Sequence, residues 1–426
     1  MNQPIPTSET ILVVGGGISG MTAALEAAEC GKQVVLVEKA PALGGRTARL
    51  YRYFPKMCHP TCGLEINLRR LKGNRNIRVL TMTEVTSLTG TRGDYTVTLS
   101  TRPRYVTSAC TACGDCARAV EATIPNAAEY GLATTKAAYL PHAMAYPLRY
   151  VIDPSIVGTA DGEKAQAACK VGAVDLGMKE DVLALKVGAV IWATGWRPYD
   201  AARIQPYGYG RFANVITSLE FERLADPAGP TGGKLLRPSD GKEATNIAFI
   251  QCAGSRDENH LRHCSRICCM ASLKQTQYVR EAHGDAGKST VYYIDIRAID
   301  RLEDFYRMVQ NDATVSFVKS KVAKIVEDEH ANPVLHGVDT EGYHRYATTH
   351  DLVVLAVGME PETAGITLPD DIVLDSSGFI EGTRDGGMCG AGAAASPLDV
   401  NRSVQSATAA ALRAIQVVRK AAAVEN

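Results

Sequence analysis

A glycine-rich turn between an apolar strand and an apolar helix constrains the fold of this chain more than any other feature. The pattern Gly15-x-Gly17-x-x-Gly20 follows the apolar run 11–14 and precedes a stretch with helical spacing of apolar residues. Gly15 permits a tight turn, Gly17 lets backbone amides approach a diphosphate, and Gly20 lets the helix pack closely on the strand. The helix N-terminus then attracts phosphate groups. The stretch predicts a dinucleotide-binding unit; the alternative is a tight turn without a ligand.

A second apolar strand supports the dinucleotide prediction. Residues 34–37 are apolar and end at Glu38, about 20 residues after the glycines, where a carboxylate can accept hydrogen bonds from a ribose diol. Cys30, in the apolar helical stretch, is expected to be buried. The cofactor contacts expected in this part of the chain are Gly15, Gly17, Ile18, Ser19, Gly20, Glu38 and Lys39.

Three later motifs resemble flavin-binding motifs of the two-dinucleotide-binding flavoproteins. These are the Gly-Gly-Arg at 44–46, the Ala-Thr-Gly at 193–195, and a glycine-rich stretch leading into an alanine-rich helix that Asp399 or Asn401 would cap. Their order implies FAD. Ala393 stands where that superfamily usually has an acid, so the contact there stays open. The contacts expected from these motifs are Gly45, Arg46, Val85, Ala193, Thr194, Gly195, Gly392 and Ala393.

A second Rossmann-like domain is outlined by residues 240–345. Flavin disulfide reductases use such a domain for NADPH, and we therefore expect an α/β, thioredoxin-reductase-like fold with two dinucleotide-binding domains. The loop between the strand at 247–251 and a helix from about Ile267 has one glycine, whereas a phosphate cradle needs two or three. A nicotinamide site is not expected there.

Four cysteines occupy this loop and its ends. Cys252 ends the strand, Cys264 lies in the loop, and Cys268 and Cys269 open the helix. Four thiolates suit zinc or an iron-sulfur cluster, and an adjacent pair is easier to place on a cluster than on one ion. A helix N-terminus also stabilises thiolates. The alternatives are buried thiols or a redox disulfide between Cys264 and Cys268.

An inserted segment, residues 103–178, carries a second cysteine set. Bacterial ferredoxins repeat C-x2-C-x2-C-x3-C-P, and the fourth cysteine of each run ligates the other cluster. The first run here keeps Cys110, Cys113 and Cys116 but has Val120 in fourth place, and the second run keeps only Cys169. These four are the complete set for one 4Fe-4S cluster, which we predict; the alternative is a ferredoxin domain that has lost both clusters.

The strings QCAGSR (251–256) and HCSRICCM (263–270), within a flavoprotein pattern, resemble the A-type subunit of heterodisulfide reductase. The resemblance is to the short form of bacterial sulfur-oxidising complexes, without the extra N-terminal domain and C-terminal ferredoxin modules of the methanogen proteins. It implies a 4Fe-4S cluster on Cys252, Cys264, Cys268 and Cys269 near the flavin. Cys58 and Cys62 match a closely spaced pair in that family, and their role stays open.

Composition narrows the class of protein. Lys plus Arg and Asp plus Glu number 46 each among 426 residues, so no basic surface for nucleic acid is indicated. No apolar run is long enough to span a membrane, and no signal peptide is visible, so we expect a cytoplasmic protein. Twelve cysteines in a reducing compartment favour metal or redox chemistry over structural disulfides.

The expected function is that of an oxidoreductase subunit that transfers electrons through FAD and one or two 4Fe-4S clusters in sulfur oxidation or disulfide chemistry. By resemblance, its partners are B- and C-type subunits of the complex and a second copy of the chain. The alternatives are an electron-bifurcating subunit, an autonomous NAD(P)H-dependent disulfide reductase and a zinc module. The expected segments are FAD domain 1–102, insertion 103–178, FAD domain 179–239, second domain 240–345 and FAD domain 346–426.

Overall fold

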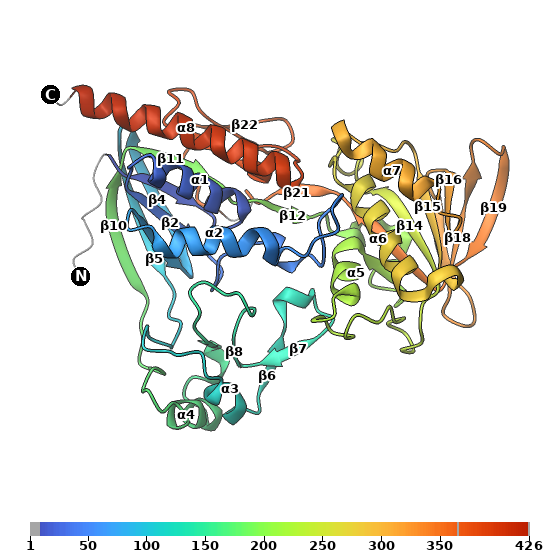
Figure 1. Ribbon diagram of the computed structural model, residues 1–426, viewed down its shortest axis with the longest axis horizontal. Helices are drawn as coiled ribbons and strands as arrows, with labels where there is room; N and C mark the ends of the chain where they lie inside the picture. The colour runs from blue at the N-terminus through green and yellow to red at the C-terminus, as the bar shows by residue number, and fades with distance from the viewer. Residues whose placement is uncertain (1–8, 364–365, 425–426) are drawn as a thin grey trace. The chain divides into compact units, whose positions relative to one another are not determined.

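The computed structural model describes residues 9–363 and 366–424 (Figure 1). The chain forms two compact units. Unit 1 contains Met1–Ala48, Thr61–Trp196 and Pro361–Asn426, and unit 2 contains Arg49–Pro60 and Arg197–Glu360. Unit 2 is therefore larger than the predicted second domain, because residues 197–239, 346–360 and 49–60 also belong to it.

Unit 1 is built on a seven-stranded sheet. The strand order is β22-β23-β24-β11-β1-β2-β3, in which β24, β11, β1, β2 and β3 run parallel. The predicted strands at 11–14 and 34–37 lie next to each other in this sheet. The strands are β1 (Ile11–Val14), β2 (Val34–Glu38), β3 (Ile77–Thr81), β11 (Ala189–Trp192), β22 (Ile372–Leu374), β23 (Ile380–Thr383) and β24 (Met388–Gly390).

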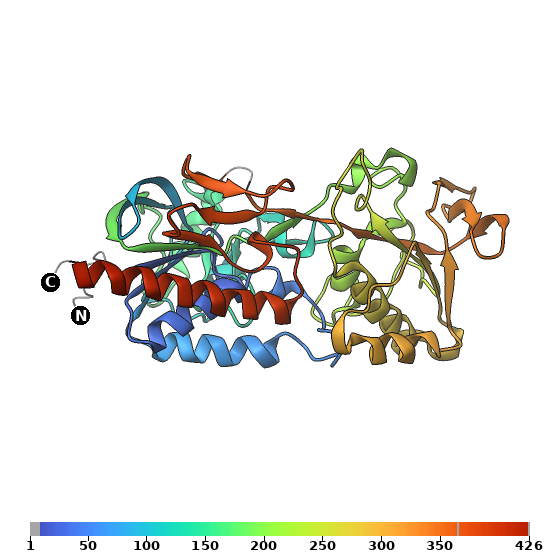
Figure 2. The ribbon, with the colours of Figure 1, turned by 90° about the horizontal axis from the view of Figure 1, so that it is seen from above.

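The two faces of this sheet have different cores. Ile11 and Val13 pack against helices α1 (Ile18–Glu29), α2 (Thr61–Gly73) and α8 (Val400–Val424). Alanines let α1 and α8 approach closely, and the two helices lie side by side (Figures 1 and 2). Leu12 and Val14, which alternate with Ile11 and Val13, face a second core. Its cover is a three-stranded meander of β4 (Thr83–Thr91), β5 (Asp94–Thr101) and β10 (Asp181–Val187).

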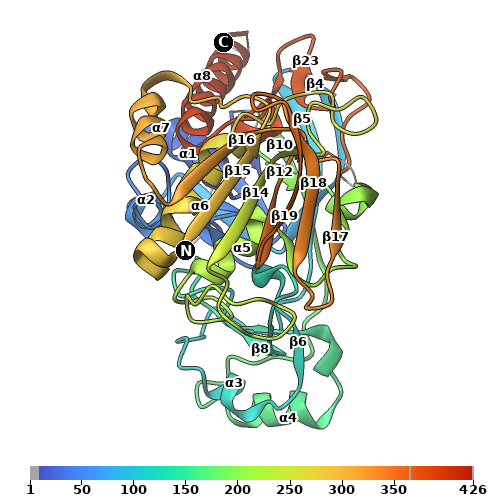
Figure 3. The same cartoon turned by 90° about the vertical axis from the view of Figure 1, so that its right-hand side faces the viewer.

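The inserted segment lies between β5 and β10 and has its own small core, which includes Val106, Val120 and Ile156. Asp161 accepts hydrogen bonds from the backbone amides of Glu121 and Ala122 at 2.9 and 2.7 Å and joins two parts of the insertion. Figure 3 shows its short helices and strands. They are α3 (Asp115–Ala119), α4 (Ala160–Ala167), β6 (Thr123–Pro125), β7 (Thr134–Lys136), β8 (Ala138–Tyr139) and β9 (Val151–Ile152).

Unit 2 contains a parallel sheet in the order β13-β20-β14-β15-β16. Helices α6 and α7 lie on one side of it, and the antiparallel β17-β18-β19 sheet lies on the other (Figure 3). Helix α5 begins with a capping box between Thr217 and Glu220. The elements are β13 (Val215–Thr217), α5 (Ser218–Ala225), β14 (Asn246–Ala253), α6 (Cys268–His283), β15 (Lys288–Tyr293), α7 (Glu303–Gln310), β16 (Val315–Lys319), β17 (Lys324–Glu327), β18 (Pro333–Asp339), β19 (His344–Thr349) and β20 (Leu352–Val357). A further two-stranded sheet pairs β12 (Trp196–Pro198) with β21 (Met359–Pro361).

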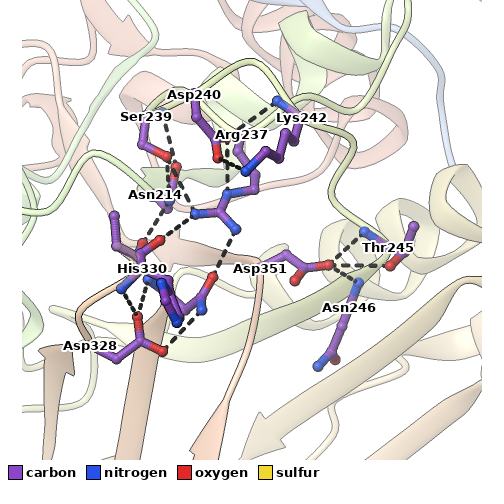
Figure 4. A network of polar contacts seen from close by, with 12 residues as sticks. Asn214, Arg237, Ser239, Asp240, Lys242, Thr245, Asn246, Asp328, His330 and Asp351 are labelled. Atoms are coloured by element: carbon purple, nitrogen blue, oxygen red, sulfur yellow. Dashed lines mark hydrogen bonds and ion pairs between the residues drawn. The ribbon is translucent and has the colours of Figure 1, made fainter.

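A network of hydrogen bonds and ion pairs connects the loops that precede the unit 2 strands (Figure 4). The Asp351 carboxylate accepts hydrogen bonds from the amides of Thr245 and Asn246, both at 2.9 Å, and so joins the entries of β14 and β20. The Arg237 guanidinium donates to the His330 carbonyl at 2.9 Å. Because most of these groups pair with one another, the loops can be partly buried; the Arg237 Nε has only an ion-pair contact with Asp240 at 3.3 Å.

Candidate functional site

The predicted dinucleotide turn forms as the glycine pattern requires. β1 ends at Val14, α1 begins at Ile18, and Gly17 caps the helix without a side-chain hydrogen bond. Gly15 has φ +109°, and a Cβ on Gly20 would overlap the Gly15 carbonyl oxygen. The first-turn N–H groups of α1 therefore have no side-chain acceptor from the cap and suit an anionic ligand.

Glu38 ends β2, as predicted, and its side chain is buried. Its carboxylate accepts hydrogen bonds from the amides of Gly16 at 2.6 Å and Ala40 at 2.7 Å. Each carboxylate oxygen has a second lone pair, which a ribose hydroxyl could use. The structure therefore fixes the orientation of the acid, and its contact with a ribose stays a prediction.

The Gly-Gly-Arg loop lies against the first glycine turn. The Gly44 amide donates to the Gly16 carbonyl at 2.9 Å, and a Cβ on Gly45, which has φ +56°, would come within 2.9 Å of the Gly17 Cα. Arg46 donates to the Trp196 carbonyl at 2.5 Å. The approach requires glycine at Gly45, whereas a Cβ on Gly17 would meet the Gly45 Cα at 3.9 Å, an ordinary contact.

The two remaining flavin motifs reach the same end of β1. The Ala193 amide donates to the Val14 carbonyl at 2.7 Å, and a Cβ on Gly392 would overlap the Ser19 hydroxyl. The buried Thr194 hydroxyl has no hydrogen-bond partner in the described part of the chain. Four motifs that are distant in sequence thus surround one turn, with an unsatisfied hydroxyl beside it, and this arrangement fits FAD.

The other predicted contacts have definite places in unit 1. Ile18 and Ser19 form the first turn of α1, Val85 is buried in β4, and Lys39 pairs with Glu362 at 3.5 Å. Gly195 has φ +78°, and Ala393 is buried in the turn before α8. Of the two predicted caps of α8, Asp399 is the one observed, since its carboxylate accepts from the Arg402 amide at 2.9 Å. Cys30, which was expected to be buried, is exposed, because it caps the C-terminal end of α1.

The four cysteines of unit 2 gather around the end of β14 and the start of α6. Cys252 lies in β14 with φ +56°, and Cys268 and Cys269 are buried at the first two positions of α6. The Cys264 sulfur accepts a hydrogen bond from the Arg266 amide at 3.4 Å. Cys269 donates to the Asp295 carbonyl at 3.7 Å.

The pKa values show that these thiols are close enough to affect one another. Burial raises the pKa of Cys268 well above the usual value, and Cys269, Cys252 and Cys264 raise it further. Burial raises the pKa of Cys269 to about 11. Burial also raises the pKa of Cys252, whereas the nearby Arg256 guanidinium lowers it. Without a cation beside them, Cys252, Cys268 and Cys269 stay protonated near neutral pH, and a metal would displace their protons.

The donor set has no metal-binding arrangement around it in this structure. In the residues that the structure describes, no group of three or more His, Cys, Asp or Glu side chains is placed to hold a metal ion. A cluster distributes its thiolates over several irons, so its ligands lie farther apart than those of one zinc ion. All twelve cysteines are free thiols, and a metal on either set stays a prediction.

The insertion brings its retained cysteines together as well. Burial raises the pKa of Cys116 to about 11, and Cys110, Cys169 and Cys113 raise it further. The amides of Ala112 and Ala173 donate to the sulfurs of Cys110 and Cys169 at 3.4 and 3.2 Å. Such amide contacts favour thiolate ligands. At the fourth place of the first run, the buried Val120 belongs to the insertion core.

Sequence reasoning missed the residues that hold the loop between Cys252 and Cys264. The buried Ser265 hydroxyl contacts the Ser255 hydroxyl at 3.1 Å and accepts from the Met359 amide at 2.8 Å. Arg256 pairs with Asp295 and also contacts the Cys252 thiol. The QCAGSR string contained Arg256, but its partner is 39 residues away, and no local pattern indicates it.

Cys58 and Cys62 belong to different units. Cys58 is half-buried in the Arg49–Pro60 segment of unit 2, and Cys62 is exposed at the beginning of α2 in unit 1. Their role stays open.

Comparison with known proteins agrees with this geometry. Residues 10–72 match the family model of FAD-dependent oxidoreductases, which covers the first glycine turn, Glu38 and the Gly-Gly-Arg loop. One of the A-type iron-sulfur subunits of CoB–CoM heterodisulfide reductase from Methanopyrus kandleri is 38% identical over 97% of this chain. The corresponding protein of Methanocaldococcus jannaschii is 38% identical over 96%.

The chain is similar over nearly its whole length to A-type subunits of heterodisulfide reductases. A third relative, from the H2:CoB–CoM heterodisulfide,ferredoxin reductase of Methanothermobacter marburgensis, is 35% identical over 96% of the chain. The chain spans 65% of the Methanopyrus protein and 64% of the other two, slightly less than two thirds of their length.

Solved structures confirm the predicted thioredoxin-reductase-like fold. The thioredoxin reductase of T. acidophilum superimposes with a TM-score of 0.53 over 96% of this chain and 98% of its own, at 14% identity. Lactococcus lactis thioredoxin reductase gives 0.52 over 97% and 99%, at 13% identity. Within the described residues, no helix is both long and apolar enough to cross a membrane.

Proposed function

We propose that this chain is an A-type subunit that transfers electrons through FAD and 4Fe-4S clusters in a heterodisulfide-reductase-like complex that acts in cytoplasmic sulfur oxidation or disulfide chemistry. The observation that carries the proposal is the set of four thiols at the junction of β14 and α6. In a nicotinamide-binding domain, the phosphate loop would occupy this junction. The position that would bind a diphosphate carries four thiols in its place.

In this proposal, unit 1 binds FAD and one cluster, and unit 2 binds the other cluster. In unit 1, the α1 N-terminus and Glu38 would hold the diphosphate and ribose of FAD, and Gly44 and Gly45 would let the backbone approach it closely. In unit 2, Cys252, Cys264, Cys268 and Cys269 would hold a cluster, and the insertion cysteines would hold a second. FAD accepts two electrons and can release them singly, which suits one-electron clusters.

The proposed partners are B- and C-type subunits of such a complex and a second copy of this chain. The relatives are named as subunits of heterodisulfide reductases, which supports a multi-subunit assembly. Equal numbers of acidic and basic residues support protein partners over nucleic acid.

Electron bifurcation is a second candidate. The Methanothermobacter relative is named for both a heterodisulfide and ferredoxin, and this name favours two acceptors in that protein. A stable flavin semiquinone in a redox titration would argue against bifurcation in this chain.

An autonomous NAD(P)H-dependent disulfide reductase is a weaker candidate. The loop after Gln251 is occupied by cysteines and held by Ser265, which leaves no glycine cradle for a second dinucleotide. Rapid bleaching of the flavin by NADH alone would restore this candidate.

The decisive measurement is iron and acid-labile sulfide per FAD in anaerobically purified protein. About eight irons are expected if both cysteine sets hold cubanes, and about four if one set does. Cys268→Ser and Cys113→Ser should each remove about four irons while FAD stays bound. FAD-containing protein with no iron, or with about one zinc per chain, would overturn the proposal.

A further inference from the structure

A basic groove runs along the outer strand of the unit 1 sheet. Its volume is about 610 Å³, and all five residues of β3 line it. The opposite side comes from the inserted segment and the strands that flank it. The groove is separate from the glycine turn, since neither the turn nor Glu38 contributes to its lining.

The charge of the groove is strongly unbalanced. Among the described residues that line the groove, one is acidic, Asp181, and five are basic. The basic residues are Arg78, Arg102, Arg104, Arg149 and Lys179. The whole chain has no net charge, so this concentration is local. In the described part of the chain, Arg102 reaches Glu84 at 3.9 Å, whereas the other four form no ion pair.

Arg104 makes the base of the groove permanently cationic. It is 7% exposed and donates to the Thr81 hydroxyl at 3.0 Å and the Arg149 carbonyl at 3.3 Å. Burial lowers its pKa to about 10, with Arg149 contributing to the shift, so it is charged at neutral pH. The guanidinium also donates to the Pro41 carbonyl. All three acceptors are uncharged oxygens, so the positive charge is hydrogen-bonded but not neutralised, and an anion in the groove would interact with it favourably.

β3 also offers unused main-chain groups. It is the last strand of the sheet, with β2 as its neighbour. The Asn76 carbonyl accepts from the Val34 amide at 2.8 Å, so main-chain groups at odd positions face away from β2. Of these, the Ile77 amide donates to the Asn74 carbonyl and the Thr81 carbonyl accepts from the Thr83 hydroxyl, whereas both main-chain groups of Val79 face outward. An edge strand of this kind can pair with an extended segment of another protein.

The charges favour an extended occupant over a small anion. Arg78 is the second residue of β3, and Arg104 contacts Thr81, three residues and about 10 Å farther along the strand. A strand with an acid at every second position can place separate carboxylates near Arg78 and near Arg104, whereas a single small anion cannot. We infer that this groove binds an acidic, extended segment of a protein partner, which adds to the sheet beside β3.

The test uses FAD-loaded protein and fluorescein-labelled peptides of about ten residues. The probe alternates Glu and Thr; one control has Lys in place of Glu, and another has N-methyl groups on alternate amides, which keep the charge but prevent strand pairing. Arg78→Glu with Lys179→Glu should weaken probe binding about tenfold, as should added salt. Lys288→Glu with Lys324→Glu, exposed in unit 2, is the matched control and should have no effect.

Four results would overturn the inference: no anisotropy change with the Glu/Thr probe, equal binding of the N-methylated peptide, unchanged binding by the Arg78/Lys179 variant, or binding of pyrophosphate without the peptide. The last would assign a small-anion site. The inference does not depend on the proposed electron-transfer function, because iron and FAD content are independent of these peptide measurements.

Discussion

Gly20 faces the Gly15 carbonyl oxygen so closely that a Cβ on Gly20 would overlap it. The close contact allows α1 to follow β1 without displacing the turn that carries the predicted phosphate site. Gly20→Ala should therefore move the turn and reduce the FAD content of the purified protein at least about tenfold, as measured by flavin absorbance.

Gly63→Ala is the matched control for that change. Gly63 lies in α2, nothing lies within 4 Å of a Cβ there, and alanine favours a helix. Full FAD content in the Gly20 variant, or equal loss in both variants, would contradict the proposed role of the turn.

Arg256 should set the reduction potential of the proposed cluster on the unit 2 cysteines. Its guanidinium contacts the Cys252 thiol and pairs with Asp295. A positive charge beside a ligand sulfur stabilises the reduced state, which carries one more negative charge. Arg256→Gln should lower the midpoint potential by tens of millivolts, about 59 mV for each tenfold change in the equilibrium constant.

Arg256→Lys retains the charge and should shift the potential less than Arg256→Gln does. Both variants should retain the iron content of the wild type, as spectroscopic redox titration and iron analysis can show. An unchanged potential with full iron in the Gln variant would refute the assignment.

The buried His350 should make unit 2 sensitive to acid. Burial lowers its pKa to about 4, and its ring nitrogens contact the Tyr292 hydroxyl and the Asn246 side-chain carbonyl, both at 3.0 Å. The unfolded state binds this proton near pH 6.5, so folding is stabilised fully above about pH 6.5 and loses stability as the pH falls towards 4. The expected loss is about 3 kcal/mol.

Hydrogen exchange in β14 and β20 at several pH values can measure this loss. His350→Gln removes the titrating group and should flatten the dependence between about pH 6.5 and 4. The same slope in the variant and the wild type would assign the acid sensitivity to other groups.

The ion pair between Lys274 and Glu222 should be essential for the stability of unit 2. The two side chains meet at 2.6 Å and are each 3% exposed. Glu222 also accepts from the Tyr51 amide at 3.1 Å, and Lys274 donates to the Arg52 carbonyl at 2.8 Å. Lys274→Met leaves a buried carboxylate unpaired and should lower the free energy of unfolding by about 3–5 kcal/mol.

Lys274→Met combined with Glu222→Gln should restore part of that stability, because no buried charge is then left alone. Urea unfolding of the single and double variants gives the comparison. Proteolysis should also cut the Arg49–Pro60 segment sooner in the single variant, since both contacts fasten that segment to the rest of unit 2. No difference in stability between the single and double variants would contradict the role of the buried charge.

Local sequence predicted the flavin end of this protein well. The strand end at Val14 was predicted to the residue, whereas α1 begins at Ile18, inside the glycine pattern that was expected to precede it. The order of strand, glycines and helix was predicted because these elements are consecutive and their geometry depends on neighbours. The sequence did not distinguish Asp399 from Asn401 as the N-cap of α8, because either side chain can accept a hydrogen bond from a first-turn amide. The helix begins at Val400, so the N-cap is Asp399, and Asn401 lies inside the helix.

The sequence by itself determined the first dinucleotide-binding pattern, the outline of a second Rossmann-like domain whose loop lacks the glycines of a phosphate cradle, and the two sets of cysteines. Only the tertiary structure decided that Arg49–Pro60 belongs to unit 2, that Arg256 stands beside Cys252, and that β3 ends its sheet next to a basic groove. Each of these depends on contacts between residues far apart in the chain, whose pairing is set by packing of whole elements and leaves no local pattern.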